Sequence, residues 1–158
     1  MLDQLTRSAA VFAAAYAALT GAHEIGDFII QRDSDAEVKG DPGLEGAAAC
    51  LRHVASYTAT QAATLYAVDR YLRIGIDWRR AATGLAISAF THYVADRCAE
   101  HWTDSTPSAP LLVRAAHGIG KGKWLTRDAR AGAFIDQAWH KGWIVVAAAV
   151  VAGPGHRP

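Results

Sequence analysis

Cysteine is scarce in this chain of 158 residues, which contains only Cys50 and Cys98 and no CxxC pair. Two such cysteines are too few for a disulfide framework and do not make a zinc knuckle. An excess of one charge is also lacking, because 16 basic residues face 15 acidic ones and leave a formal charge of +1. With no basic excess to attract phosphate groups, we expect no nucleic acid among the partners.

No stretch of the chain has the alternation of apolar and polar residues that is typical of a β-strand. Apolar segments instead predict four helices, over residues 4–31, 46–72, 78–100 and 133–152. Asp77 is placed to cap the third helix, and turn-forming residues predict loops over 32–45 and 101–131. We therefore expect an all-α, four-helix up-down bundle, with one domain over residues 1–153 and a disordered tail over 154–158.

Imidazole and carboxylate side chains recur at a spacing of four residues in three of these helices. The groups are His23-Asp27-Gln31, His92-Asp96 and Asp136-His140. Residues four apart lie on the same face of a helix, so each group is expected to stack. About one such pair arises by chance in a chain with this many His and Asp residues, so the spacing alone is only suggestive.

The stronger argument is that these groups should lie at the same end of the bundle. In an up-down-up-down arrangement, the end of the first helix, the start of the second, the end of the third and the start of the fourth share one end. The three groups occupy such positions, and so does His53 in the second helix. Both long loops also emerge at that end, which favours a covered site there.

Imidazole and carboxylate ligands without thiolate suit zinc, iron or manganese, as one ion or two. The predicted metal ligands are His23, Asp27, His53, His92, Asp96, Asp136 and His140. Among them the carboxylates of Asp27, Asp96 and Asp136 are also candidate catalytic groups, whereas Gln31 and Lys39 are candidate ligand-binding residues. In the alternative without metal, each His donates its ring N–H to the Asp one turn away. His101 and His117 are expected to be solvated surface residues.

A membrane location is the favoured interpretation of the apolar helices. Residues 4–31 form a helix of about 42 Å, long enough to cross a bilayer, and residues 143–152 are almost wholly apolar. The mean hydropathy of +0.06 is low for such a protein, although polar loops account for part of that value. We expect a multi-pass protein of the cell membrane, with membrane lipid and an amphiphilic small molecule as partners.

The succession of His23, Asp27-Phe28, Gln31, Lys39, His53, His92-x-x-x-Asp96 and Asp136-Gln137-x-x-His140 covers about residues 20–150. It resembles a family of small bacterial and phage proteins that are predicted to lie in the membrane, domain of unknown function 3307. The resemblance implies a helical membrane protein and supplies no reaction.

Three functions are compatible with these residues. The first is a metal-dependent, hydrolase-like enzyme in which an ion activates water and a spare Asp takes the proton. The second is a non-enzymatic membrane protein that binds or moves a metal ion. The third is an interaction protein whose polar pairs only fix the register of its helices.

Overall fold

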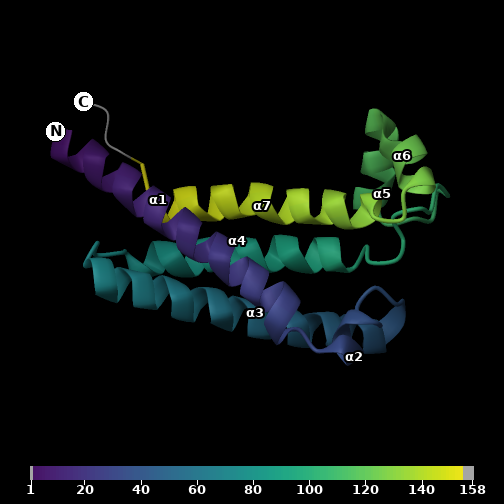
Figure 1. Cartoon of the computed structure of the whole chain (residues 1–158), viewed down its shortest axis with the longest axis horizontal. Helices are drawn as coiled ribbons and strands as arrows, with labels where there is room; N and C mark the ends of the chain where they lie inside the picture. The colour runs from purple at the N-terminus through teal and green to yellow at the C-terminus, as the bar shows by residue number, and fades with distance from the viewer. Residues whose placement is uncertain (1, 155–158) are drawn as a thin grey trace.

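The fold is all-α, as predicted: a computed structural model describes residues 2–154 and has no strand within them. Four long helices make up most of the molecule (Figure 1), namely α1 (Leu2–Ile25), α3 (Gly43–Leu72), α4 (Trp78–Asp96) and α7 (Ala131–Ala152). The shorter elements are η1 (Gly26–Ile30), α2 (Asp33–Ala36), α5 (Leu111–Ala116), η2 (His117–Lys121) and α6 (Gly122–Arg127). Of the predicted disordered tail, residues 155–158 lie outside the described part of the chain.

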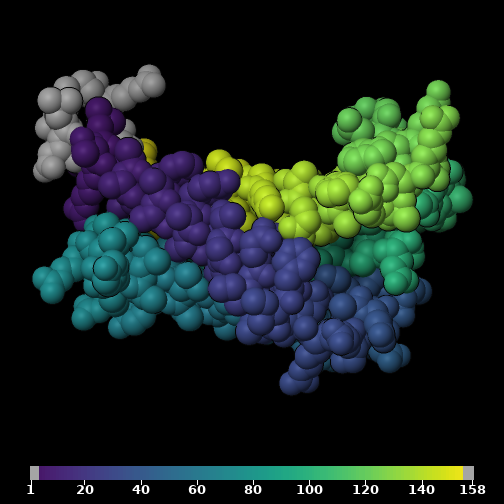
Figure 2. Space-filling model, viewed as in Figure 1, coloured from purple at the N-terminus to yellow at the C-terminus, as the bar shows by residue number. Residues whose placement is uncertain are grey.

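Successive long helices run in alternating directions, and α1 crosses the other three obliquely (Figure 1). α4 packs against both α3 and α7, while α1 packs against α3 and α7 on their other side. The molecule is elongated, and α5 and α6 form a lobe at the end away from the start of α1 (Figure 2). The end of α4 and the starts of α3 and α7 lie toward that lobe.

The predicted cap of α4 is confirmed, because the Asp77 carboxylate accepts the backbone N–H of Arg79 over 2.9 Å. The long segments between helices are more structured than predicted. Residues 32–45 include α2, and residues 101–131 include α5, η2 and α6. The second of these segments has a small apolar core of its own, made by Cys98, Trp102, Ala109, Val113, Ala116, Leu125 and Ala131. The lobe is therefore a packed structure and not an open loop.

The main apolar core fills the space among the four long helices. Its large members include Leu19, Leu65, Leu85, Ile144 and Val151. Along α4 and α7, the buried His and Asp residues lie between this main core and the small core of the lobe. Polar side chains thus occupy the boundary between two apolar cores.

Gly84 allows α4 to approach α7 closely. A Cβ added there would lie 2.8 Å from the carbonyl oxygen of Ala147 and 2.9 Å from Cγ2 of Val151. We predict that Gly84→Ala lowers the free energy of unfolding by about 1–3 kcal/mol, measured by urea denaturation, because the helices must move apart. Gly142→Ala on α7 is the matched control: nothing lies within 4 Å of its added Cβ, so it should keep or raise stability. A Gly84→Ala protein as stable as this control would contradict the close packing.

The predicted multi-pass location is wrong. Among residues 2–154, no helix combines the length and the apolar content that crossing a membrane requires. The physical reason is that alanine, which dominates these helices, is only weakly apolar, and polar residues interrupt the longer runs. In α7, for example, Asp136, His140 and Lys141 precede the apolar segment.

Candidate metal centre

The first helix does not run unbroken to Gln31 as predicted. After Ile25 the chain forms the π-helical turn η1, in which the Gln31 N–H donates to the carbonyl of Gly26 over 3.0 Å. A π turn holds more residues than an α turn, so a spacing of four no longer places Gln31 directly above Asp27 on the helix. The Nε2 atom of Gln31 is buried without a hydrogen-bond partner among the described residues. Its ligand-binding role stays a prediction.

Gly26 brings η1 into close contact with α3. A Cβ at this position would lie 3.0 Å from Cδ2 of Tyr57, so a larger residue would push the two elements apart. The Tyr57 ring is itself fixed, because its hydroxyl accepts a hydrogen bond of 2.8 Å from Gln61 and its centroid lies 3.9 Å from that of His92. This packing places Asp27, the residue after Gly26, beside α3 and α4.

The facing Nε2 atoms of two imidazoles each contact two carboxylates, and the four side chains come from three elements. The Nε2 atoms of His53 on α3 and His92 on α4 lie 3.0 Å apart. Each of them lies 3.4 Å from Oδ1 of Asp27. Each also lies 3.3 Å from Oδ2 of Asp96. We call these four atoms the four-atom centre, and all four side chains are buried or nearly so.

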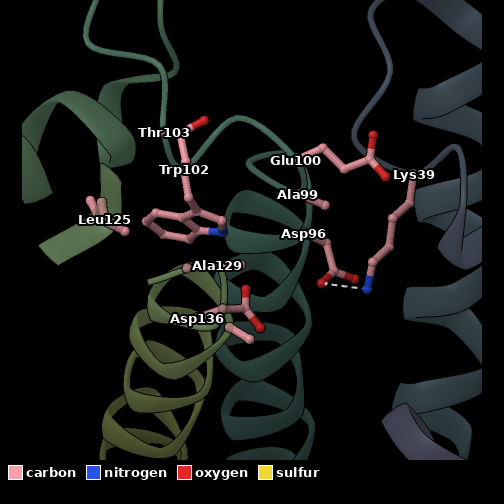
Figure 3. Close-up of a pocket in the computed structure, with 11 residues that line it drawn as sticks. Lys39, Asp96, Ala99, Glu100, Trp102, Thr103, Leu125, Ala129 and Asp136 are labelled. Carbon is pink, nitrogen blue, oxygen red and sulfur yellow. Dashed lines mark hydrogen bonds and ion pairs between the residues drawn. The ribbon is translucent and has the colours of Figure 1, made fainter. Parts of the chain in front are cut away.

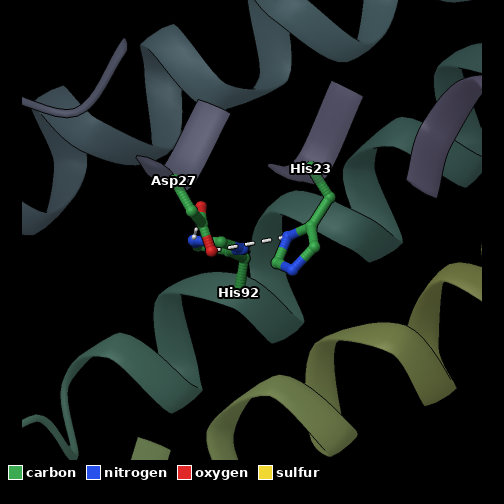
Figure 4. Close-up of side chains that lie close together, drawn as sticks. All are labelled: His23, Asp27 and His92. Carbon is green, nitrogen blue, oxygen red and sulfur yellow. Dashed lines mark ion pairs between the residues drawn. The ribbon is translucent and has the colours of Figure 1, made fainter. Parts of the chain in front are cut away.

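His23 lies beside the four-atom centre. Its Nδ1 is 3.5 Å from Oδ2 of Asp27, and its Nε2 is 3.0 Å from Oε1 of Gln137 on α7. In Figure 4 the side chains of His23 and Asp27 point toward the ring of His92. His23 therefore orients Asp27 from outside the centre. Gln137 was not predicted as a site residue, although its position one turn before His140 places it on the same face of α7.

The second oxygen of Asp96 faces a different set of side chains. Its Oδ1 lies 2.9 Å from Nζ of Lys39 and 3.9 Å from Nε2 of His140. His140 in turn lies 3.2 Å from Oδ2 of Asp136. Figure 3 shows Lys39 reaching Asp96 from the segment before α3, with Asp136 on the neighbouring helix. The structure thus brings together all seven predicted metal ligands and Lys39.

The segment that carries Lys39 is fastened to the end of α4. Arg97 donates to the carbonyl of Lys39 and, over 2.7 Å, to that of Asp41. The Nε2 atom of His101 donates to the carbonyl of Gly40 over 3.1 Å. The prediction that His101 is a solvated surface residue is therefore wrong. His117 was predicted likewise, but its Nε2 lies 3.1 Å from the carbonyl oxygen of Trp102.

The surroundings keep both carboxylates of the four-atom centre ionised at neutral pH. Burial raises the pKa of Asp27, but the contact with His53 and the neighbouring imidazoles outweigh burial and the net pKa is lowered. Burial acts in the same way on Asp96, and His92 together with Lys39 lowers the pKa of this group well below its usual range. Burial lowers the pKa of the His92 imidazole, so its ring is neutral at pH 7 and offers a lone pair.

His140 behaves differently from His92, although the two rings stack with centroids 4.0 Å apart. Burial lowers the pKa of His140, but the close contact with the Asp136 carboxylate and its charge outweigh burial and raise the pKa overall. The neutral imidazole of His92 and the more basic imidazole of His140 thus lie on the two sides of Asp96.

Several buried polar atoms in this region have no hydrogen-bond partner among the described residues. They are Oδ1 of Asp27, Oδ2 of Asp96, Nε2 of His140 and the Nδ1 atoms of His23, His53 and His92. Buried polar groups are normally paired, so the cluster is not satisfied by its own hydrogen bonds. Three groups of its residues have the spacing to hold a metal ion, namely His23-Asp27-His92, His53-His92-Asp96 and Asp96-Asp136-His140.

Two cavities reach the cluster. One, of about 340 Å³, is lined on one side by Lys39, Asp96 and Asp136 and on the other by apolar residues such as Trp102 and Leu125 (Figure 3). The second, of about 420 Å³, reaches His53 and is lined by Arg32, Asp35 and Arg52, among others. Small molecules can therefore approach the buried side chains without unfolding of the helices.

Comparison with known proteins gives no relative: no family model, no curated protein and no solved structure matches the chain. The resemblance to the family of small bacterial and phage proteins therefore has no support beyond the residues quoted for it.

Proposed function

We propose that a divalent metal ion binds at the four-atom centre, near one end of an up-down four-helix bundle. A tetrahedral ion with ligand bonds of about 2.0–2.1 Å holds its ligand atoms about 3.3–3.4 Å apart. The N···N separation and the four N···O separations of the centre are 3.0–3.4 Å. This agreement is the observation that carries the proposal. Two imidazoles with two carboxylates suit zinc, iron or manganese.

Hydrogen bonding without a metal accounts poorly for the same atoms. If His53 and His92 share an N–H···N bond, it uses the only hydrogen on their two facing nitrogens. The oxygens of Asp27 and Asp96 in the centre then receive none, although they lie 3.3–3.4 Å from those nitrogens. If each ring instead donates its Nε2–H to a carboxylate, two protonated nitrogens lie only 3.0 Å apart. Buried carboxylates without compensation are costly, whereas a cation at the centre satisfies all four atoms.

The proposed activity is hydrolysis of a small amphiphilic molecule. A bound divalent ion supplies Lewis acidity and lowers the pKa of water. Asp136 is the candidate general base, because its side chain is 20% exposed, lines the cavity and lies next to the centre. The cavity offers charged groups on one wall and Trp102 and Leu125 on the other, which suits a molecule with a polar and an apolar end. Contact with membrane lipid stays a prediction.

A second candidate is a metal-binding protein without catalysis. It is favoured by the number of ligands, because four side chains complete a tetrahedron and leave zinc no open position. Iron and manganese accept more ligands, so the same four side chains would leave positions open for water. The identity of the ion therefore separates the two functions.

The first test is the metal content of purified protein, measured by elemental analysis. We predict about one ion per chain in the wild type and a loss of at least about tenfold in affinity in His53→Ala and His92→Ala, because each removes a ligand. His117→Ala is the matched control and should keep the ion, since His117 bonds to the backbone of the lobe. Wild-type protein that stays free of zinc, iron and manganese after incubation with each would overturn the proposal.

The same samples distinguish between the two candidate functions, a metal-dependent enzyme and a metal-binding protein without catalysis. Loaded with manganese, the wild type should hydrolyse a chromogenic amphiphilic ester, and Asp136→Asn should slow that turnover by about 10²–10⁴-fold while keeping its ion. Retained metal with no turnover in any loaded form would favour the non-catalytic candidate.

A further inference from the structure

A second cation position lies beside the four-atom centre. It is bounded by Oδ1 of Asp96, Oδ2 of Asp136 and Nε2 of His140, and these three residues offer ligand atoms within 4.8 Å of one another. His140 is only 2% exposed, and its Nε2 has no hydrogen-bond partner among the described residues. A buried nitrogen aimed at two carboxylates has the environment of a metal ligand.

The Lys39 ammonium lies beside this position. Its Nζ is 2.9 Å from Oδ1 of Asp96, the same oxygen that faces His140. Arg97 and His101 hold the backbone on either side of Lys39 against α4, so the side chain is directed to Asp96. The ammonium supplies one positive charge next to Oδ1 of Asp96, and its charge repels a further cation there.

We propose that the charge of Lys39, on the shared oxygen of Asp96, substitutes for a second metal ion and thereby keeps the centre mononuclear. This inference rests on the proposed metal site, because Asp96 then bridges two cations, with Oδ2 on the metal ion and Oδ1 on the ammonium. Two-metal hydrolytic sites use a bridged pair of ions to stabilise attacking and leaving oxygens. Here the ammonium provides the positive charge of the second ion. The substrate group next to it is an anionic or strongly polarised oxygen.

The position is open to exchange because it faces the cavity of about 340 Å³. Lys39, Asp96 and Asp136 all line that cavity, as Figure 3 shows. A free ion can therefore enter once the ammonium is removed, without movement of the helices that carry its ligands.

The test is the number of ions per chain in Lys39→Met, which keeps the length of the side chain and removes its charge. After incubation with excess manganese or zinc and gel filtration, elemental analysis should give two ions per chain in this variant and one in the wild type. Lys39→Met/Asp136→Asn should return to one. Lys141→Met is the control for loss of a lysine, because Lys141 pairs with the half-buried Glu24 at 3.1 Å, away from the cluster, and this variant should stay at one ion.

Each other outcome contradicts one named part of the proposal. One ion in both wild type and Lys39→Met would overturn the second position and leave the proposed function intact. Two ions in Lys39→Met that persist in the double variant would place the second ion elsewhere and also overturn it. No ion in the wild type but one in Lys39→Met would overturn the proposed function and keep the second position.

A second measurement covers the case in which Lys39→Met does not fold. Asp136→Asn and His140→Ala, made in the wild-type background, should both keep the single ion, because neither residue belongs to the four-atom centre. Loss of that ion in both variants would show that it is bound at the second position, and the assignment of Lys39 to that place would be wrong.

Discussion

Replacing Asp96 by Asn should lower the free energy of unfolding by about 3–5 kcal/mol even in metal-free protein, because it leaves a largely buried cation without its partner. The Lys39 side chain is only 15% exposed, and the Asp96 side chain is 2% exposed. Urea denaturation in the presence of a chelator measures this effect apart from the loss of an ion. The substitution keeps the shape of the side chain, so overpacking does not contribute.

The control for Asp96→Asn is a double-mutant cycle with Lys39→Met. When the ammonium is already absent, the same substitution should cost much less, and the difference between the two backgrounds reports the coupling of the pair. A loss below about 1 kcal/mol in the wild-type background, the value typical of exposed ion pairs, would show that Lys39 is well solvated without Asp96.

Metal binding should raise the stability of the wild type by about 4 kcal/mol when the free ion is at 1,000 times its dissociation constant. The physical reason is that the ion binds the assembled centre and has little affinity for the unfolded chain. Thermal or urea denaturation with and without zinc or manganese measures the increase. In His53→Ala, adding the ion should not raise the stability. The stability of each protein without the ion is the reference for its own increase.

The effect of the ion should weaken in acid. The pKa of His92 lies below its usual value of 6.5 because of burial, so protons compete with the metal for this ligand only below pH 6.5. Metal-dependent stability is thus fully present at neutral pH and is lost as pH falls through the pKa of the folded state. An increase that persists undiminished in strong acid, or that appears equally in His53→Ala, would place the ion outside the four-atom centre.

The cluster could be predicted from the sequence because it depends on the spacing of residues along each helix and on the alternating directions of the helices. A spacing of four residues identifies side chains that share a helix face, as in His92 and Asp96. Alternating helices then place those faces at one end, and the contacts among His53, Asp27 and Asp96 agree with that expectation.

Other features depend on tertiary contacts that no local pattern encodes. The π turn at Gly26 arises where η1 meets Tyr57, and the identity of a lone glycine does not indicate it. His101 looked like an ordinary surface residue, because its partner is a backbone carbonyl of Gly40, far away in the chain. The prediction of a multi-pass location is wrong for a different reason: the helices are long and rich in alanine, but alanine is only weakly hydrophobic.

The position of the polar cluster between two apolar cores has a consequence for the order of folding. Its four-atom centre draws Asp27 from η1, His53 from α3 and both His92 and Asp96 from α4, so no single helix or hairpin contains the complete set. The ion can therefore be captured only after these elements have docked, late on the folding pathway. A contact formed that late stabilises the native state more than the transition state. A bound metal ion should accordingly lower the rate of unfolding and leave the rate of folding almost unchanged.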